Sequence, residues 1–344
     1  MKTIQIRTAR PYEVRIGDHL LDTIGLQMRQ LTKAQKICIV SDTNVFGLYG
    51  MPIINDLVKE DFEVSQFVFP AGESSKNHQV YVDLLQHLAI SQLTRYDCIL
   101  ALGGGVVGDL AGFAAATYLR GIDYVQVPTS LLAMVDSSVG GKTGIDLPQG
   151  KNLCGAFWQP LAVFCDTCVL QSLSQPEWIN GCAEIIKYGI LFSPDMINQL
   201  EQDGFAFHRQ DIIAECVNCK KYAVEQDETD HGQRMLLNLG HTLGHAIEAV
   251  SNYTIPHGYA VSIGVAMIAK ASHCPDYSRI VALLDQFGLP TTTRFCPHQL
   301  YSKVISDKKR VDDTISFIIP NTIGNCQVHP VAIADLITFI EEGM

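Results

Sequence analysis

Two patterns of apolar residues follow one another along the chain, and the change falls near residue 170. Before it, short apolar runs alternate with helical segments. Strands are predicted at 36–40, 62–69, 98–102, 124–127 and 162–165, and helices at 80–93 and 110–117. Repetition of strand, loop and helix is typical of a parallel sheet covered by helices. Residues 1–170 are therefore predicted to form an α/β domain.

From residue 171 onward the apolar positions follow a mostly helical period. Helices are predicted at 176–191, 211–226, 233–250, 258–272 and 276–287, and a late strand pair at 314–319 and 325–328. Residues 171–344 are therefore predicted to form a mostly α-helical domain. No apolar stretch reaches the roughly 18 residues of a membrane-spanning helix, and the N-terminus lacks a continuous apolar signal core. A cytoplasmic protein is expected.

A stripe of polar side chains is predicted on the helix at 233–250. Its members, separated by 4, 3, 4 and 3 positions, are Arg234, Asn238, His241, His245 and Glu248. On a continuous helix this spacing places all five on one face, and the remaining surface is apolar. Burying an unpaired polar group costs roughly 2–7 kcal/mol. Hydrogen bonds among the five groups are one explanation, but so many groups in register favour a metal ion and a charged ligand.

A carboxylate that suits such an ion occurs in the helix predicted at 176–191. Glu184 and Lys187 are one turn apart between apolar residues, where a surface salt bridge is the simpler alternative. One carboxylate and two imidazoles leave open positions for substrate oxygens, as in catalytic zinc sites. The spacing does not decide which two of His241, His245 and His257 would complete the set.

A glycine-rich turn follows the strand predicted at 98–102. Gly103, Gly105 and Gly108 satisfy the pattern GxGxxG, which lets phosphates approach the N-terminus of the next helix. A tight turn without a ligand is the alternative, because the motif lies later in the chain than is usual for dinucleotide sites. Asp42, at the end of an earlier strand, is a candidate for contacting ribose hydroxyls. Lysines in the small, polar segments 135–144 and 150–152 suit an anion, with charges on surface loops as the alternative.

Charge and cysteine content narrow the classes of protein. A net charge of −11 argues against general nucleic-acid affinity, which depends on neutralising phosphates. Eleven cysteines is an odd number, and their scatter through apolar segments favours reduced core thiols. Two CxxC pairs, Cys165/Cys168 and Cys216/Cys219, are interpreted as coincidental, with a four-cysteine zinc site as the alternative.

Five segments carry most of these residues: 103–121, 135–144, 150–152, 183–189 and 237–248. Together they closely resemble the 3-dehydroquinate synthase family of the shikimate pathway, over nearly the whole chain. The resemblance implies an N-terminal Rossmann-like domain joined to a mostly α-helical C-terminal domain, with the active site in the cleft between them. It also implies a homodimeric lyase that depends on NAD and on a divalent metal, zinc or cobalt.

The reaction implied by the resemblance converts 3-deoxy-D-arabino-heptulosonate 7-phosphate into 3-dehydroquinate and phosphate, on the route to chorismate and aromatic amino acids. NAD oxidises the substrate transiently, phosphate leaves by β-elimination, the hydride returns, and an aldol step closes the ring. The protein would contribute mainly positioning and charge stabilisation. His245 would assist proton transfer, because an imidazole ordinarily titrates near neutral pH.

The resemblance assigns residues to three roles. The implied metal ligands are Glu184, His241 and His257. The implied NAD contacts are Asp42, Glu73, Lys76, Gly105, Val106, Val107, Gly108, Asp109, Thr129, Ser130, Lys142, Lys151 and Leu170 to Ser172. The implied catalytic and substrate contacts are Asp136, Lys142, Lys151, Asn152, Lys187, Lys220, Arg234, Asn238 and His245, one of Lys308 and Lys309, and Arg120 reaching from a partner subunit.

Three positions depart from the family pattern. Tyr259 stands where a glutamate usually follows His257-Gly258, an arginine expected within 174–178 is missing, and Asp230 replaces a common glutamate. None of the three removes a ligand, so they bear on rate and metal preference. Alternative functions are another sugar-phosphate cyclase such as a 2-deoxy-scyllo-inosose synthase, a metal-dependent polyol dehydrogenase, or a non-catalytic dinucleotide-binding module.

Overall fold

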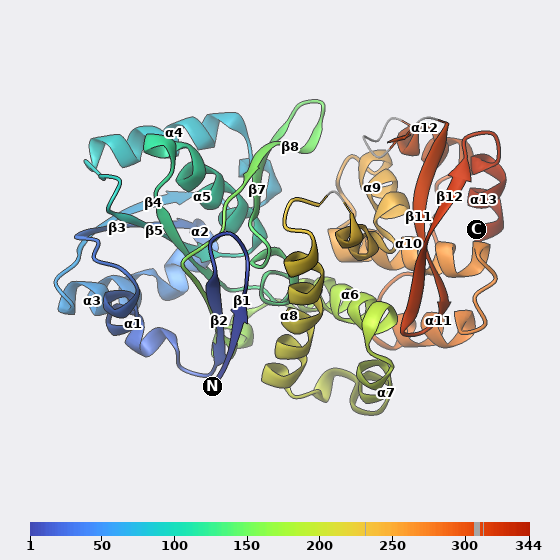
Figure 1. Cartoon of the computed structure of the whole chain (residues 1–344), viewed down its shortest axis with the longest axis horizontal. Helices are drawn as coiled ribbons and strands as arrows, with labels where there is room; N and C mark the ends of the chain where they lie inside the picture. Colours follow the sequence, from blue (N-terminus) through green and yellow to red (C-terminus); the bar gives the residue numbers. More distant parts are fainter. Residues whose placement is uncertain (231, 306–309, 312) are drawn as a thin grey trace. The chain divides into compact units, whose positions relative to one another are not determined.

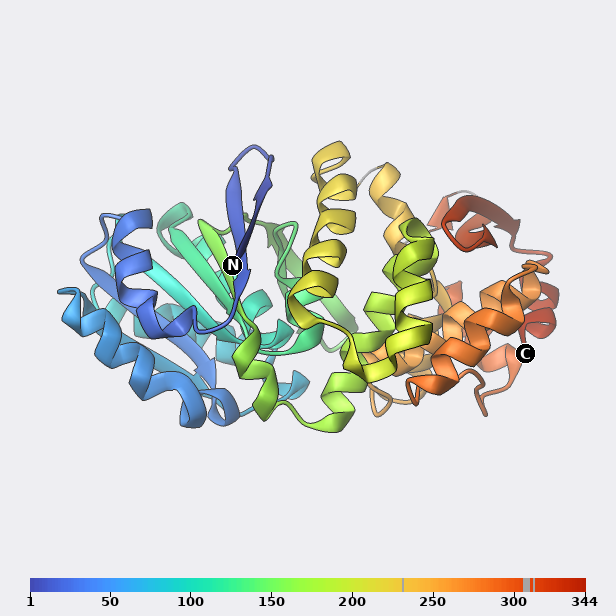
Figure 2. The ribbon, with the colours of Figure 1, turned by 90° about the horizontal axis from the view of Figure 1, so that it is seen from below.

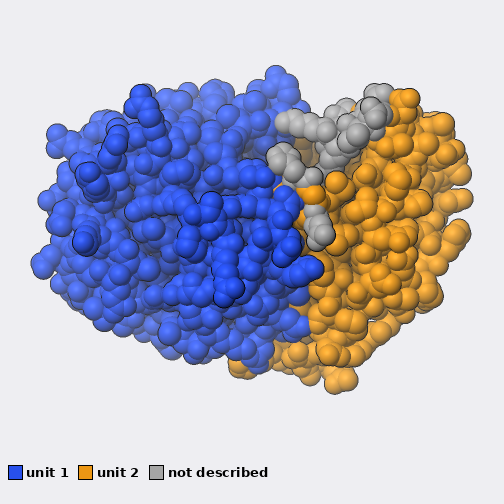
Figure 3. Space-filling view, in the orientation of Figure 1, with its two compact units in different colours: residues 1–174, 209–229 blue, residues 175–208, 230–344 orange. Residues whose placement is uncertain are grey.

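The chain forms two compact units in a computed structural model that describes every residue except 231, 306–309 and 312. Unit 1 contains residues 1–174 and 209–229, and unit 2 contains residues 175–208 and 230–344 (Figure 3). This division differs from the predicted boundary at 170/171 in one main respect. Helix α8 (Arg209–Gln226) belongs to unit 1, because it packs against β1 (Lys2–Ile6) and β2 (Tyr12–Gly17) (Figures 1 and 2).

Unit 1 is built on a seven-stranded sheet in the order β1-β2-β9-β6-β5-β3-β4. The strands not yet given are β3 (Lys36–Asp42), β4 (Glu63–Phe69), β5 (Cys98–Gly103), β6 (Asp123–Pro128) and β9 (Ala162–Asp166). β1 and β2 pair antiparallel, and the other neighbours pair parallel. The predicted parallel sheet is confirmed, and the β1–β2 hairpin extends it at one edge.

Helices cover both faces of this sheet (Figure 1). α1 (Ile24–Leu31) and α3 (Met51–Lys59) pack on one face, and α4 (His78–Ile90) and α5 (Gly105–Thr117) on the other. Within β3 the side chains alternate between the two cores: Cys38 and Val40 face α4 and α5, whereas Ile37 and Ile39 face α1 and α3. Burial on both faces explains why the central strands β3, β5, β6 and β9 are mostly apolar.

Shorter elements connect the strands and helices of unit 1. They are η1 (Leu21–Thr23), α2 (Thr43–Val45), η2 (Phe46–Gly50), η3 (Glu73–Ser75), η4 (Tyr118–Arg120), η5 (Ala133–Ser137), η6 (Thr167–Ser172) and the antiparallel hairpin β7 (Lys142–Leu147) and β8 (Gly150–Phe157). The hairpin contains residues 142–144 and 150–152 of the small, polar segments, which the sequence pattern did not predict as strands.

Unit 2 is mostly helical, as predicted. Its helices are α6 (Gln175–Phe192), α7 (Pro194–Asp203), η7 (Gly204–Ala206), η8 (Gln233–Asn238), α9 (His241–Val250), α10 (His257–Ala271), α11 (Tyr277–Gln286), α12 (Pro297–Val304) and α13 (Leu336–Gly343). An antiparallel sheet of β10 (Arg310–Val311), β11 (Thr314–Thr322) and β12 (Asn325–Ala332) accompanies them. α10 is buried along nearly its whole length and contacts α6, α9, α11 and α13. Among the described residues, no helix is long and apolar enough to cross a bilayer.

The continuous helix predicted at 233–250 is wrong, because the chain turns sharply before His241. Gly240 has a φ of +77°, in the left-handed region that favours glycine, and it separates η8 from α9. A Cβ atom here would lie 2.7 Å from the carbonyl oxygen of Val261 on α10. Arg234 and Asn238 therefore precede the turn, and only the later members of the predicted stripe share α9.

Candidate active site

Three side chains from separate helices converge in unit 2. Glu184 lies in the middle of α6 and is fully buried, while His241 and His257 are the first residues of α9 and α10. The Nε2 atoms of His241 and His257 lie 3.7 Å and 3.6 Å from Oε1 of Glu184. Bonds of about 2.1 Å to a tetrahedral zinc ion place two ligand atoms about 3.4 Å apart. The cluster therefore has the dimensions and the donor set of a divalent metal site.

The electrostatic environment differs between the two imidazoles. Burial lowers the pKa of His241 well below its usual value, and Lys187 and the neighbouring imidazoles lower it further. Burial also acts to lower the pKa of His257, but Glu184 and Glu248 outweigh it and raise this pKa to about 10. Burial thus favours the neutral form of His241, and the carboxylates that favour a proton on His257 would equally favour a metal ion in its place.

Four further polar residues of unit 2 were predicted to belong to the site. Lys187, one turn after Glu184, forms an ion pair with it, and both side chains are buried, which excludes the surface salt bridge considered from the sequence. Arg234 is buried in η8, and Asn238 ends that helix. His245 is exposed on α9, with its ring centroid 5.5 Å from that of His241. Lys187 and His245 therefore adjoin the cluster directly.

In unit 1, the glycine-rich turn lies at the carboxyl edge of the parallel strands. Gly104 precedes α5, and a Cβ atom at Gly105 would lie 3.1 Å from Oγ of Ser137. Thr129, directly after β6, donates its backbone N–H to the carbonyl of Gly103 at 3.0 Å. Asp42 ends β3 and accepts two N–H groups at the start of α2. The predicted NAD contacts on three strand ends therefore share one edge, which is where nucleotides bind in such sheets.

A charged network adjoins this turn. Nζ of Lys76 lies 2.7 Å from Oδ2 of Asp109 at the start of α5. Oε1 of Glu73 lies 3.6 Å from Nζ of Lys76 and 3.6 Å from Nζ of Lys151. Burial acts to lower the pKa of Lys76, but Asp109 and Glu73 outweigh it and raise this pKa, so the side chain stays charged. Burial raises the pKa of Asp109 despite the lysine. The network joins η3, α5 and β8.

The remaining predicted residues of unit 1 differ in exposure: Lys220 is buried, whereas Lys142, Asn152 and Arg120 are exposed. Lys220 on α8 contacts Asp136 through Oδ1 at 2.9 Å and through the carbonyl at 2.7 Å. Asn152 has a φ of +54°, and its N–H donates to Asp146 at 2.8 Å. Arg120 also has a positive φ, of +66°. Lys142 begins β7. Lys308 and Lys309 lie outside the described residues.

Two residues near the site were not assigned a role from the sequence. Asn180 accepts the N–H of Gly258 at 2.6 Å and so holds the start of α10. Glu248 approaches the far side of the His257 ring. The position of Glu248 in the predicted polar stripe indicated that it belongs to the site, but its spacing in the sequence did not link it to His257. Tyr259, by contrast, is influenced by Glu177, which together with burial raises its pKa.

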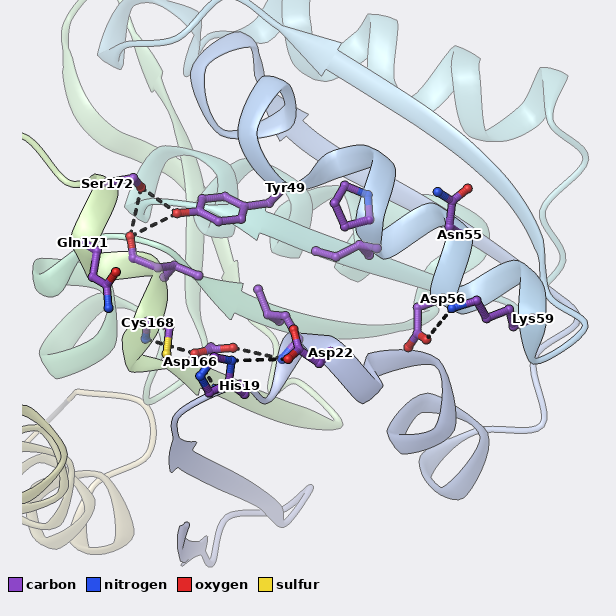
Figure 4. A pocket seen from close by; sticks show the side chains of 14 residues that line it. His19, Asp22, Tyr49, Asn55, Asp56, Lys59, Asp166, Cys168, Gln171 and Ser172 are labelled. Carbon is purple, nitrogen blue, oxygen red and sulfur yellow. Dashed lines mark hydrogen bonds and ion pairs between the residues drawn. The ribbon is translucent and has the colours of Figure 1, made fainter.

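A pocket of about 880 Å³ opens in unit 1 (Figure 4). η1, α3 and η6 contribute to its lining, and the Tyr49 hydroxyl lies 2.6 Å from Oγ of Ser172. Ser172 belongs to the segment that the resemblance assigns to NAD. The pocket therefore borders predicted cofactor contacts.

Solved structures define the class of fold. A 2-deoxy-scyllo-inosose synthase, solved with carbaglucose-6-phosphate, NAD⁺ and Co²⁺, aligns over 100% of both chains with a TM-score of 0.89 and 25% identity. An iron-containing alcohol dehydrogenase aligns over 98% of both chains with a TM-score of 0.70 and 13% identity, which shows the fold alone. The fold is that of the sugar-phosphate cyclases, which iron-containing alcohol dehydrogenases share.

Sequence relatives identify the family. The 3-dehydroquinate synthase N-terminal and C-terminal family models match residues 66–180 and 181–310. The 3-dehydroquinate synthase of Streptococcus suis is 39% identical, over 96% of this chain and 97% of its own length. That of Picosynechococcus is 42% identical, over 95% of this chain and 94% of its own length. The chain belongs to the 3-dehydroquinate synthase family, which confirms the family and the enzyme class expected from the motifs.

Proposed function

We propose that this chain converts 3-deoxy-D-arabino-heptulosonate 7-phosphate into 3-dehydroquinate and phosphate. The observation that carries the proposal is the convergence of Glu184, His241 and His257 in a chain so similar to 3-dehydroquinate synthases. The relatives' names support the reaction, and the NAD⁺ and Co²⁺ of the solved cyclase support the two cofactors.

The residues present fit both cofactors. Glu184, His241 and His257 would hold zinc or cobalt and leave coordination positions open for substrate oxygens. The strand ends of unit 1, with Asp42 and the turn before α5, would hold NAD. When bound, NAD supplies a reversible oxidation, and the metal ion supplies a Lewis acid.

The chain's own groups then bind and orient the substrate. Lys187 provides buried positive charge beside the metal cluster, and Arg234 provides buried positive charge in η8; both suit a carboxylate or a phosphate. Lys151 and Asn152, on the β7–β8 hairpin, would hold the phosphate that leaves. His245 is exposed close to the metal ligands, where an imidazole exchanges protons near neutral pH.

The proposal includes a homodimer, as the resemblance implies. Leu119, Arg120 and Gly121 form an exposed or half-buried turn with three successive positive φ angles, of +51°, +66° and +120°. Arg120 is exposed in this turn, so its side chain is accessible to a partner copy. The cytoplasmic location stays a prediction.

The test is a direct assay with purified protein, trace NAD and zinc. With the heptulosonate phosphate, phosphate and 3-dehydroquinate should appear in equal amounts without accumulation of NADH. A parallel reaction with glucose 6-phosphate tests the inosose synthase alternative, and polyols test the dehydrogenase alternative. NADH formed in proportion to turnover, or product from glucose 6-phosphate alone, would overturn the proposal.

A further inference from the structure

A second carboxylate lies behind one of the metal-site histidines. Glu248, on α9, is 2% exposed, and its Oε2 lies 3.5 Å from Nδ1 of His257. On the opposite side of the same ring, Nε2 lies 3.6 Å from Oε1 of Glu184. The His257 ring is therefore placed between two carboxylates, one at each nitrogen.

We propose that Glu248 is a positioning residue for the metal site: it accepts the Nδ1–H of His257 and holds Nε2 toward Glu184 and the ion. The inference rests on the proposed metal site. A neutral imidazole carries one proton, so placing it on Nδ1 leaves the lone pair on Nε2. A carboxylate on the far nitrogen fixes the ring orientation and makes the ligating nitrogen more basic.

His241 shows the same arrangement with a weaker acceptor. Its Nδ1 lies 3.0 Å from the carbonyl oxygen of Leu239, which directs Nε2 toward Glu184. Both histidines are thus oriented through Nδ1, His241 by a neutral carbonyl and His257 by a carboxylate. Because a buried carboxylate is costly unless it is paired, the contact with His257 also helps to explain why Glu248 is retained inside α9.

The position of Glu248 on α9 matters because α10 itself carries no acidic residue. Its sequence, from His257 to Ala271, contains neither aspartate nor glutamate. In this chain the carboxylate at Nδ1 of His257 therefore comes from the neighbouring helix. The metal site thereby depends on the packing of α9 against α10.

A second ion is the rival explanation for this carboxylate. Ligand atoms of His245, Glu248 and His257 lie within 4.8 Å of one another, close enough to surround a cation. Filling both sites at once would require His257 to bind two ions through its two nitrogens and to lose both ring protons. The positioning role needs no such deprotonation, and the number of ions bound distinguishes the two explanations.

The test compares two substitutions of Glu248, one that removes only its negative charge and one that also removes its hydrogen-bond acceptor. Glu248→Gln keeps a neutral acceptor for Nδ1–H but removes the charge, and Glu248→Leu removes the acceptor. The control is Glu201→Gln, the same chemical change at an ion pair with Arg279 elsewhere in unit 2. The zinc dissociation constant is measured on metal-free protein by competition with a chromophoric chelator, without NAD or substrate. Bound ions per chain and the Co²⁺ absorption spectrum are recorded in parallel.

We expect the zinc dissociation constant to rise about 10–100-fold in Glu248→Leu and by a smaller factor in Glu248→Gln, as for other partners of ligating histidines. The control should stay within twofold, and every variant should bind one ion. Circular dichroism checks folding, and if Glu248→Leu does not fold, the glutamine variant decides alone. An unchanged zinc affinity in the Glu248 variants would overturn the inference. It would also be overturned if the wild type bound two ions and the Glu248 variants bound only one. Because the zinc-binding measurement uses no substrate, its outcome can be told apart from a failure of the synthase assay.

Discussion

Adding a single methyl group at Gly240 should disrupt the crossing of α9 and α10. In Gly240→Ala the new Cβ atom would lie 2.6 Å from Cγ2 of Val265 and 2.7 Å from the carbonyl oxygen of Val261. A side-chain methyl can move, but the carbonyl belongs to the helix backbone. His241 follows directly, so any movement of α9 also displaces a metal ligand.

The magnitude has two components. A left-handed φ of +77° costs an alanine about 1–2 kcal/mol, and overpacking a close contact costs about 1–3 kcal/mol. Alanine also has less conformational freedom than glycine in the unfolded chain, which stabilises the folded variant by about 0.4–1 kcal/mol. We therefore expect Gly240→Ala to lower the free energy of unfolding by about 3 kcal/mol, within a range of about 1–5 kcal/mol, and also to weaken zinc binding.

Gly288→Ala, also in unit 2, isolates the backbone component. Its φ is +69°, and its Cβ atom would meet only Cδ1 of Ile179 at an ordinary 3.6 Å. Gly288→Ala should lower the free energy of unfolding by about 1 kcal/mol and leave the zinc affinity unchanged. Urea unfolding of the metal-free proteins, followed by circular dichroism, measures the difference. Equal losses in the two variants would show that α9 and α10 do not approach as closely as described.

Three further substitutions test the site and the fold. His241→Ala should abolish metal-dependent phosphate release while the circular dichroism spectrum is retained; an unchanged rate would refute the assigned site. Lys151→Ala should lower kcat about 10²–10³-fold with little change in stability, because the loss is in stabilising the departing phosphate; a change in stability alone would contradict this. Asp97 is buried, which acts to raise its pKa, but N–H groups of Thr94 and Lys36, at 2.7 Å and 2.8 Å, contribute to lowering it overall. Its stabilising effect is therefore present above the ordinary aspartate pKa of about 3.9 and is lost as pH falls through the lower folded value. Asp97→Asn should be less stable at neutral pH and should depend less on pH between about 2 and 5; an unchanged pH dependence of urea unfolding would disprove this role.

The parallel sheet could be predicted because its strands are buried on both faces. All residues of β5 are buried, which requires a continuous apolar run. The β7–β8 hairpin could not be predicted in the same way, because glycines and polar residues interrupt its apolar residues. Gly144 and Gly155 face each other there, and a Cβ at Gly155 would lie 2.1 Å from the carbonyl of Thr143. Close backbone approach, rather than side-chain pattern, determines that hairpin.

The candidate site was only partly predictable for a similar reason. Leu239 and Gly240 fit the helical period, so the turn before α9 left no trace in the pattern of apolar positions. Spacing alone also could not choose between the histidines, because the choice depends on which rings the helix crossing brings to Glu184. The structure brings His241 and His257 there, and it leaves His245 exposed on α9.

The placement of α8 has a consequence for how the protein is made. The chain leaves unit 1 after residue 174 and returns to it for residues 209–229. During translation, unit 1 therefore cannot be completed until α8 has been synthesised, and α8 follows residues 175–208 of unit 2. A fragment ending near residue 174 would lack Lys220 beside Asp136. Neither half of this enzyme is a contiguous gene segment that can be separated cleanly from the other.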